Sequence, residues 1–392
     1  MRTATMDELL EQAVTDGVMP GVIVAVGDPD GVLYEGAFGR LSVEGEEPAR
    51  PSTMIWIASM TKPIVSVAAL QLVEQGRLEL EQPVADVLPA FGELQVLEGF
   101  DGDAPRLRAP ARQATIRHLL THTSGLSYWF ANSDVRRYHE LTGIPDPGAG
   151  KRAVLQMPLV VDPGTRWEYG TNFDWLGQVI ETVSGQDLAG YCREHIFSPL
   201  GMADATFSPT DEQAARMMLV HARTPDGGLV PAPLEAPEEP DYWSGGHGVF
   251  ATAPDYLRFM RMLLRGGELD GARVLRAETI DLAFTDHLHG VPLPDLVRSA
   301  VPELTNDVPA LPFAQGFGLG IHLFLEDIPA MRRAGSGDWA GLSNCYFWID
   351  RTAGVAATLL TQVLPFYDAP IVEAASGFEQ AVYAEVGTRT AA

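Results

Sequence analysis

The chain has 392 residues, 46% of them hydrophobic, and carries a formal net charge of −25 at pH 7. The length exceeds the range over which one hydrophobic core keeps growing, so we expect two lobes. The strong negative charge argues against nucleic acid and against an anionic membrane surface as partners.

The first part of the chain predicts a helix, a hairpin and a second helix. Apolar residues at helical spacing predict a helix over 6–17. The β-branched run Gly21–Val26 and the segment Val32–Phe38 flank the turn Asp28–Gly31, which predicts an antiparallel hairpin. After a polar stretch, Ile64–Val73 is a strongly apolar helical segment.

The middle of the chain, from about residue 79 to 310, predicts helices separated by long loops. The helical segments are Ile116–Leu120, Phe173–Val183 and Asp255–Leu264. The Pro-, Gly- and Asp-rich loops are 97–114, 224–245 and 289–312. Loops of this length inside a compact domain usually carry function or form the wall of a site.

Strand patterns return at the C-terminal end of the chain. The expected strands are Gly318–Leu323, Asn344–Ile349 and Val355–Val363, followed by a closing helix over Ala369–Val386. Strands at both ends with helices between them predict an α+β fold in which both termini build one antiparallel sheet. We therefore expect an α/β domain made of 1–78 and 311–392, and a mainly helical domain over 79–310. The active site is expected in the cleft between the two domains.

Lysine is rare in this chain, and its placement is informative. Of the 27 lysines and arginines only Lys62 and Lys151 are lysines, and Lys62 closes the sequence Ser59-Met60-Thr61-Lys62. An amine loses its proton near neutral pH when it is desolvated, whereas a guanidinium does not. Residues three apart share a helix face, and a serine hydroxyl needs a neighbouring base to act as a nucleophile. The pair predicts a nucleophile and its base at a helix N-terminus, where free N–H groups offer half of an oxyanion hole.

Two further segments supply candidate partners for this pair. Tyr169 ends the loop that begins at Pro163, just before an apolar helix, and a phenol beside a lysine can relay protons. The glycine-rich segment Gly335–Leu342 predicts a strand that approaches a substrate closely and offers a backbone N–H. Packing roles for Tyr169 and for Trp339 within that segment are the alternatives.

The joint order of these motifs resembles the class C β-lactamase and penicillin-binding protein-like serine hydrolases. More narrowly, it is similar to the family VIII carboxylesterases. The motifs are S-x-x-K, Leu119–Gly125, P-G-x-x-x-x-Y, Gly245–Asp255 with Leu263–Gly271, and W-x-G, and they span nearly the whole chain from about residue 6.

The resemblance implies roles for individual residues. Ser59 is the acylated nucleophile, and Lys62 with Tyr169 acts as base and acid. The backbone N–H groups of Ser59 and Leu342 form the oxyanion hole. Trp339, Ala340 and Gly341 contact the substrate, and no metal or cofactor is required.

Two departures from the lactamase pattern favour an esterase. Where lactamases have Y-x-N, this chain has Tyr169-Gly170-Thr171, and Asn172 falls one position late. Where they have K-T-G, this chain has Trp339-Ala340-Gly341. The asparagine amide and the lysine charge that this chain lacks would bind the amide and the carboxylate of a β-lactam. An uncharged ester does not need either group. No G-x-S-x-G occurs, which excludes the usual nucleophile elbow of α/β-hydrolases.

The sequence therefore predicts a serine carboxylesterase that hydrolyses short-chain, small-molecule esters through an acyl-Ser59 intermediate. The alternatives are a β-lactamase, amidase, DD-peptidase or acyltransferase on the same fold, and a catalytically silent binding module. The N-terminus has no apolar signal core and Cys192 and Cys345 form no disulfide framework, so a cytoplasmic location is expected. The oligomeric state is left open.

Other polar and aromatic candidates have structural alternatives. His122 is read as a hydrogen-bonded turn residue rather than a triad base, because Lys62 and Tyr169 already fill that role. His287 and His289 lack carboxylates at ligand spacing, which favours a loop pair over a metal site. Aromatic residues in or beside the long loops line an acyl pocket or pack in the core, with the two readings left open for each: Trp129, Phe130, Trp243, Phe313 and Phe317.

Overall fold

A computed structural model describes residues 3–232 and 240–390 of the chain. Its central element is a seven-stranded sheet in the order β13-β14-β15-β16-β17-β1-β2, with every neighbouring pair antiparallel. The strands are β1 (Gly21–Gly27), β2 (Val32–Gly39), β13 (Gln315–Phe317), β14 (His322–Phe324), β15 (Gly337–Gly341), β16 (Cys345–Asp350) and β17 (Val355–Leu360). Both ends of the chain thus build one sheet, and the α+β prediction is confirmed.

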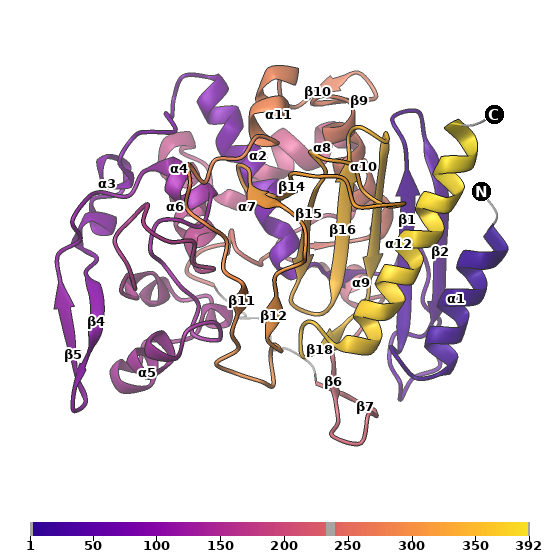
Figure 1. The fold of residues 1–392 in the computed structure, drawn as a ribbon, viewed down its shortest axis with the longest axis horizontal. Helices are drawn as coiled ribbons and strands as arrows, with labels where there is room; N and C mark the ends of the chain where they lie inside the picture. The colour runs from indigo at the N-terminus through magenta and orange to yellow at the C-terminus, as the bar shows by residue number, and fades with distance from the viewer. Residues whose placement is uncertain (1–2, 233–239, 391–392) are drawn as a thin grey trace.

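Helices cover both faces of this sheet (Figure 1). On one face α1 (Thr3–Thr15) and α12 (Ala369–Thr390) lie side by side, so the first and last helices are neighbours. On the other face α10 (Ala253–Leu264) packs against β1, β16 and β17. α10 belongs to the span that was assigned to the helical domain, yet it packs on the sheet. The division into two domains itself stays a prediction.

Strand β1 shows why the sheet takes its place between these layers. All its residues are buried, and alternate side chains enter different cores. Val22, Val24 and Val26 pack with α1 and α12, whereas Ile23 and Ala25 face the larger core. A strand covered on both faces reads as a continuous apolar run, which is the pattern that predicted it.

The larger core, which Ile23 and Ala25 face, surrounds α2 (Thr61–Glu74), the helix that follows Ser59. Its residues from Thr61 to Leu72 are all buried, including Lys62. α2 contacts α6 (Asn172–Ser184) and α7 (Leu188–Cys192), and α6 contacts α4 (Ile116–Leu120). The remaining helices are α3 (Val84–Val87), α5 (Ser133–Thr142), α8 (Ser198–Leu200), α9 (Asp211–Ala214) and α11 (Ala277–Ala283).

Short strands also pair outside the main sheet, and some of them lie inside the stretches that were expected to be loops. The pairs are β3 (Ile55–Trp56) with β8 (Phe250–Ala251), β4 (Val96–Asp101) with β5 (Ala104–Arg108), β9 (Glu268–Leu269) with β10 (Ala272–Arg273), and β11 (Leu296–Val297) with β12 (Val308–Pro309). β6 (His221–Arg223), β7 (Leu229–Pro231) and β18 (Val363–Leu364) form a small sheet of their own. Part of the expected loop 224–245, residues 233–239, lies outside the described residues.

Two sequence-based expectations about strands are wrong. The expected loop 97–114 contains most of the β4–β5 hairpin, because the charged side chains of its strands hid the pairing pattern. The expected single strand Gly318–Leu323 is wrong over its first four residues, because 318–321 form a tight turn in which Gly320 adopts a left-handed backbone with φ +85°, and only its last two residues belong to β14. A Cβ at Gly320 would also lie 1.7 Å from the Ser66 hydroxyl oxygen, so the turn packs directly on α2.

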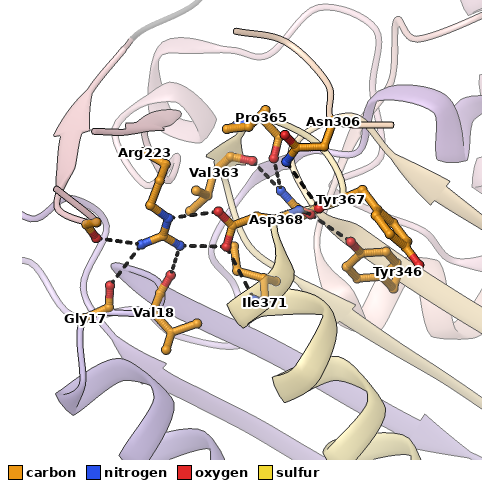
Figure 2. Close-up of polar contacts among 12 residues, drawn as sticks. Gly17, Val18, Arg223, Asn306, Tyr346, Val363, Pro365, Tyr367, Asp368 and Ile371 are labelled. Atoms are coloured by element: carbon orange, nitrogen blue, oxygen red, sulfur yellow. Dashed lines mark hydrogen bonds and ion pairs between the residues drawn. The ribbon is translucent and has the colours of Figure 1, made fainter. Parts of the chain in front are cut away.

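A polar cluster anchors the turn between β15 and β16 (Figure 2). Asn344 in this turn donates to the carbonyl oxygens of Val363 and Pro365 at 2.8 and 2.9 Å, and accepts from the Tyr346 hydroxyl at 2.7 Å. The backbone N–H of Asp368 also donates to Asn344, and the Asp368 carboxylate pairs with Arg223 at 2.8 Å. The turn that carries Leu342 is therefore held by the distant segment 363–368, which Arg223 fixes in its turn.

Candidate active site

Ser59 stands in a short 3₁₀ turn that enters α2, and two strands fix this turn. β3 pairs with β8, and the backbone N–H of Ile57 donates to the Val249 carbonyl at 3.1 Å. Ala58, directly before the serine, is fully buried and has a left-handed backbone with φ +46°. Such a conformation costs a residue other than glycine on the order of 1–3 kcal/mol, and it recurs at functional sites. The surrounding packing therefore holds the Ser59 hydroxyl in a set position.

Lys62 is 1% exposed and directs its amine at three oxygen atoms. Nζ lies 2.9 Å from Ser59 Oγ, 2.9 Å from the Tyr169 hydroxyl and 2.8 Å from the Gly246 carbonyl oxygen. Burial lowers the pKa of Lys62 to about 7, against an opposing effect from the negative charge of Asp174. The amine thus changes its protonation state near neutral pH, as the sequence argument required.

Tyr169 completes a triangle with Ser59 and Lys62. Its hydroxyl lies 2.6 Å from Ser59 Oγ. The turn between α4 and α5 fixes its backbone, since the Tyr128 N–H donates to the Tyr169 carbonyl at 3.0 Å. A Cβ at the next residue, Gly170, would lie 2.3 Å from the Leu126 carbonyl, so glycine is required there. Burial raises the pKa of Tyr169, and the phenol keeps its proton at neutral pH.

The strand β15 brings the W-A-G segment to the same place. A Cβ at Gly341 would lie 2.4 Å from the Ile57 carbonyl oxygen, so this strand passes directly beside the segment that leads to Ser59. The Trp339 ring contacts the Tyr169 ring edge-on, with centroids 5.5 Å apart. Ala340 and Leu342 are half-buried. The predicted substrate contacts of Trp339, Ala340 and Gly341, and the oxyanion role of the Ser59 and Leu342 amides, stay proposals that this proximity supports.

His122 lies behind Tyr169 and bonds to a different residue. Its Nδ1 accepts from the Asn172 side-chain amide at 2.9 Å. The ring is fully buried against Tyr169 and Trp339, and burial together with the nearby Lys62 holds its pKa well below the ordinary value. This geometry supports the structural reading of His122. It also shows that Asn172 is used inside the fold, where its amide binds Ser124 and His122.

The aromatic candidates divide between the site and the surrounding fold. The Phe317 ring packs against Trp339 at 5.4 Å, and Phe130 lies 6.3 Å from Tyr169. Trp129 stacks instead on His139, and Trp243 packs against Phe207. Phe313 is half-buried. Phe130 and Phe317 are therefore the stronger candidates for an apolar wall, and their contact with a substrate stays a prediction.

Three residues of the site were given no role from the sequence: Asp174, Ser244, and Gly246, which lies within the motif Gly245–Asp255. Asp174 is fully buried in the first turn of α6, and its Oδ1 accepts from the Ser244 hydroxyl at 2.6 Å. Gly246 provides the carbonyl that Lys62 binds. An acidic residue inside an apolar helix and the triplet Ser244-Gly245-Gly246 were the available signals.

Within residues 3–232 and 240–390, no group of three or more His, Cys, Asp or Glu side chains is arranged to hold a metal ion. His287 is bound within the fold, where its Nε2–H donates to the Leu282 carbonyl oxygen at 2.8 Å. In the same described ranges, no helix has both the length and the apolar character that a membrane crossing demands.

A sheet built from both termini and a Ser-x-x-Lys pair closed by a tyrosine define the β-lactamase-like class of serine enzymes. The β-lactamase family model matches residues 6–382, and the chain belongs to this family. It is an enzyme of the group that contains serine hydrolases and acyltransferases.

Relatives of both kinds match nearly the whole chain. Monacolin J acid methylbutanoyltransferase of Aspergillus terreus is 33% identical over 402 residues, which cover 97% of this chain and 95% of the relative. Lovastatin esterase of Penicillium rubens is 33% identical over 384 residues, which cover 92% of this chain and 93% of the relative. The unliganded structure of simvastatin synthase (LovD) from Aspergillus terreus has a TM-score of 0.83 and 32% identity, over 97% of this chain and 98% of that one.

Proposed function

We propose that this enzyme transfers acyl groups from carboxylic esters through an ester bond to Ser59, and that water or an alcohol then accepts the acyl group. The observation that carries this proposal is the triangle of Ser59, Lys62 and Tyr169, with all three polar atoms within 2.6–2.9 Å of one another. Hydrolysis of short-chain esters, predicted from the sequence, is one outcome of this chemistry. Transfer to an alcohol is the other.

In the first half-reaction, Ser59 Oγ attacks the ester carbonyl and its proton passes to Lys62. The free amine is available because the pKa of Lys62 is about 7. As the bond to the leaving alcohol breaks, Tyr169 gives that oxygen a proton and recovers one from Lys62. The raised pKa of Tyr169 suits this role, since a neutral phenol is a donor. The backbone N–H groups of Ser59 and Leu342 stabilise the negative oxygen of the tetrahedral intermediate.

In the second half-reaction, the acceptor repeats these steps in reverse. Water or an alcohol loses its proton to the Tyr169–Lys62 pair and attacks the acyl carbon, and Ser59 Oγ regains a proton as it leaves. The same proton transfers release the acyl group from Ser59 with either acceptor: water gives the free acid, and an alcohol gives a new ester. Which one prevails depends on how well the site binds an alcohol relative to water.

The relatives support both outcomes, because one is described as a methylbutanoyltransferase and another as an esterase. The departures from the lactamase pattern support esters over β-lactams. Trp339 and Ala340 stand where lactamases have lysine and threonine, and Asn172 is bound to Ser124 and His122. Membership in the narrower family VIII carboxylesterases stays a prediction.

Two measurements test the proposal. A fluorophosphonate probe followed by mass spectrometry is expected to label Ser59 stoichiometrically. Ser66→Ala is the matched control, because Ser66 lies in α2, the helix that follows Ser59, and its buried hydroxyl bonds to no described residue, so labelling is expected to persist. Labelling at another serine contradicts the nucleophile assignment, and no labelling at all favours a silent binding module.

The second measurement separates hydrolysis from transfer. A series of nitrophenyl esters is turned over with and without a graded concentration of a small alcohol, and the free acid and the new ester are quantified. A new ester that grows with alcohol concentration at constant nitrophenol release shows partition of one acyl-enzyme. If free acid is the product at every alcohol concentration and no new ester forms, the enzyme is a hydrolase, and the proposed transfer to an alcohol is wrong.

A further inference from the structure

Asp174 is a buried carboxylate that the proposed reaction does not use. It lies in the first turn of α6, is 0% exposed, and its Oδ2 atom bonds to no polar group in the described parts of the chain. A buried carboxylate is costly unless hydrogen bonds and an opposite charge compensate it. The partners of its other oxygen lead directly to the amine of Lys62.

The link runs through the loop Ser244–Gly246. Asp174 Oδ1 accepts from the Ser244 hydroxyl at 2.6 Å and from the Gly246 backbone N–H at 3.3 Å. The Gly246 N–H also lies 3.2 Å from Ser244 Oγ, so hydroxyl and carboxylate hold the same peptide. The carbonyl of Gly246 accepts from Lys62 Nζ at 2.8 Å. Asp174 thereby fixes the Gly246 carbonyl oxygen, the third oxygen atom to which the Lys62 amine donates.

The two glycines in this loop are needed for the close approach. A Cβ at Gly245 would lie 2.1 Å from the Phe173 carbonyl oxygen, directly before Asp174. A Cβ at Gly246 would lie 2.7 Å from the Tyr128 hydroxyl and 2.8 Å from Asp174 Oδ2. The loop therefore sits against α6 with no room for a side chain, and a small movement of Asp174 moves the Gly246 carbonyl.

We propose that Asp174 is a positioning residue for Lys62: it holds the Gly246 peptide in register and supplies the negative charge that favours the protonated amine. This inference rests on the proposed function, because it assigns a partner to the base of that reaction. Asp174 acts through Ser244 and Gly246 and is not itself in contact with the reacting atoms.

The other titratable groups around Lys62 are neutral near pH 7. Burial raises the pKa of Tyr128 and of Tyr169, whose rings face the amine, and these phenols keep their protons. Burial lowers the pKa of His122 and of His247, and each imidazole is uncharged. The charge of Asp174 is the one that raises the pKa of Lys62 against desolvation.

The direction of the pH effect follows from this environment. The free amine of Lys62 accepts the serine proton, so ester turnover falls as the pH drops through the pKa of about 7. Asp174→Asn keeps an acceptor for Ser244 and removes the charge, which lowers the pKa of Lys62. The acid limb of kcat/KM is expected to move to lower pH by about one unit, the size typical of losing an opposite charge nearby.

The experiment compares pH profiles of kcat/KM for a nitrophenyl ester in wild type, Asp174→Asn and Ser244→Ala. Ser244→Ala leaves the charge in place and removes a bond that holds Gly246. It is expected to lower kcat about tenfold with little change in KM, while the acid limb stays where it is in the wild type. Asp350→Asn is the control, because Asp350 is an equally buried carboxylate bound by Tyr383. Its acid limb is expected to match that of the wild type.

An unmoved acid limb in a folded Asp174→Asn variant overturns the proposal. If that variant does not fold, Ser244→Ala decides, and wild-type kcat in Ser244→Ala overturns the positioning role. Fluorophosphonate labelling of Ser59 is measured in every variant. If the wild type is labelled at Ser59 but the pH profile of Asp174→Asn does not move, the proposed role of Asp174 is refuted and the proposed function stands. If the wild type carries no adduct on Ser59, the proposed function is refuted.

Discussion

Replacing Lys62 with arginine keeps the positive charge and removes the proposed base. Nζ of Lys62 bonds three oxygens at 2.8–2.9 Å from a fully buried position. A guanidinium stays protonated at any pH that the protein tolerates. A positioned general base contributes roughly 10²–10⁴-fold to a rate, which corresponds to about 3–5 kcal/mol of transition-state stabilisation. We expect Lys62→Arg to lose kcat/KM for a nitrophenyl ester by that factor.

The bulk of the guanidinium adds a second cost. The site around Lys62 is filled, and an oversized buried side chain destabilises a fold by about 1–3 kcal/mol. Lys62→Met fills a similar volume without charge. Comparing the kinetics of the Arg, Met and Ala variants of Lys62 therefore separates the loss of the proposed base from the effect of disturbed packing. Thermal unfolding of each variant is measured beside its kinetics.

Lys151→Arg is the matched control for this prediction. Lys151 pairs with Asp241 at 3.3 Å on the surface, with about half of its side chain exposed, and arginine preserves that ion pair. Its kinetics are expected to equal those of the wild type. If Lys62→Arg retains more than about a tenth of wild-type kcat/KM, positive charge suffices and the base role of Lys62 is wrong.

Three further outcomes are expected. Ser59→Ala abolishes ester turnover and fluorophosphonate labelling while its unfolding temperature stays near that of the wild type; steady-state turnover in a folded Ser59→Ala enzyme contradicts the acyl-Ser59 mechanism. Tyr169→Phe lowers kcat by roughly 10²-fold or more with little change in KM, because it removes the phenol that lies 2.6 Å from Ser59 Oγ and leaves the ring in place; unimpaired kcat removes Tyr169 from proton transfer. A chromogenic cephalosporin is turned over roughly two to four orders of magnitude less efficiently than the best ester, because Thr171 and Trp339-Ala340-Gly341 offer no amide or charge for a lactam; equal kcat/KM values favour a lactamase.

Much of the architecture follows from patterns that are local in the sequence. The apolar run Gly21–Val26 predicted a strand buried on both faces, and β1 is one. The three-residue spacing of Ser59 and Lys62 predicted their contact, since neighbouring turns of helical backbone bring such residues together. These features depend on dihedral angles and burial within a few residues, which the sequence specifies directly.

The β4–β5 hairpin and the turn at Gly320 were not predicted, because neither leaves a clear pattern in its own segment of the sequence. Only Val96 and Leu97 are buried in β4, so the hairpin lacks the apolar alternation that marks a half-buried strand. The Asp101-Gly102 pair was its one clear turn signal, and Gly102 does adopt a left-handed backbone. At Gly320 the close approach to Ser66 sets the turn, and that contact belongs to another segment.

The sequence motif named Tyr169 as a partner of Lys62, but the tertiary structure decided which other distant groups surround this amine. Tyr169 lies 107 residues away from Lys62 and Gly246 lies 184 residues away, yet both bond to the same nitrogen. No periodicity encodes a contact over such separations. The place of Asp174 depends in the same way on how α6 packs against the loop at Ser244. The sequence singled out Ser59 and Lys62 as the proposed nucleophile and base, whereas the packing of α2, α6 and that loop determined the charge and desolvation that set the pKa of Lys62.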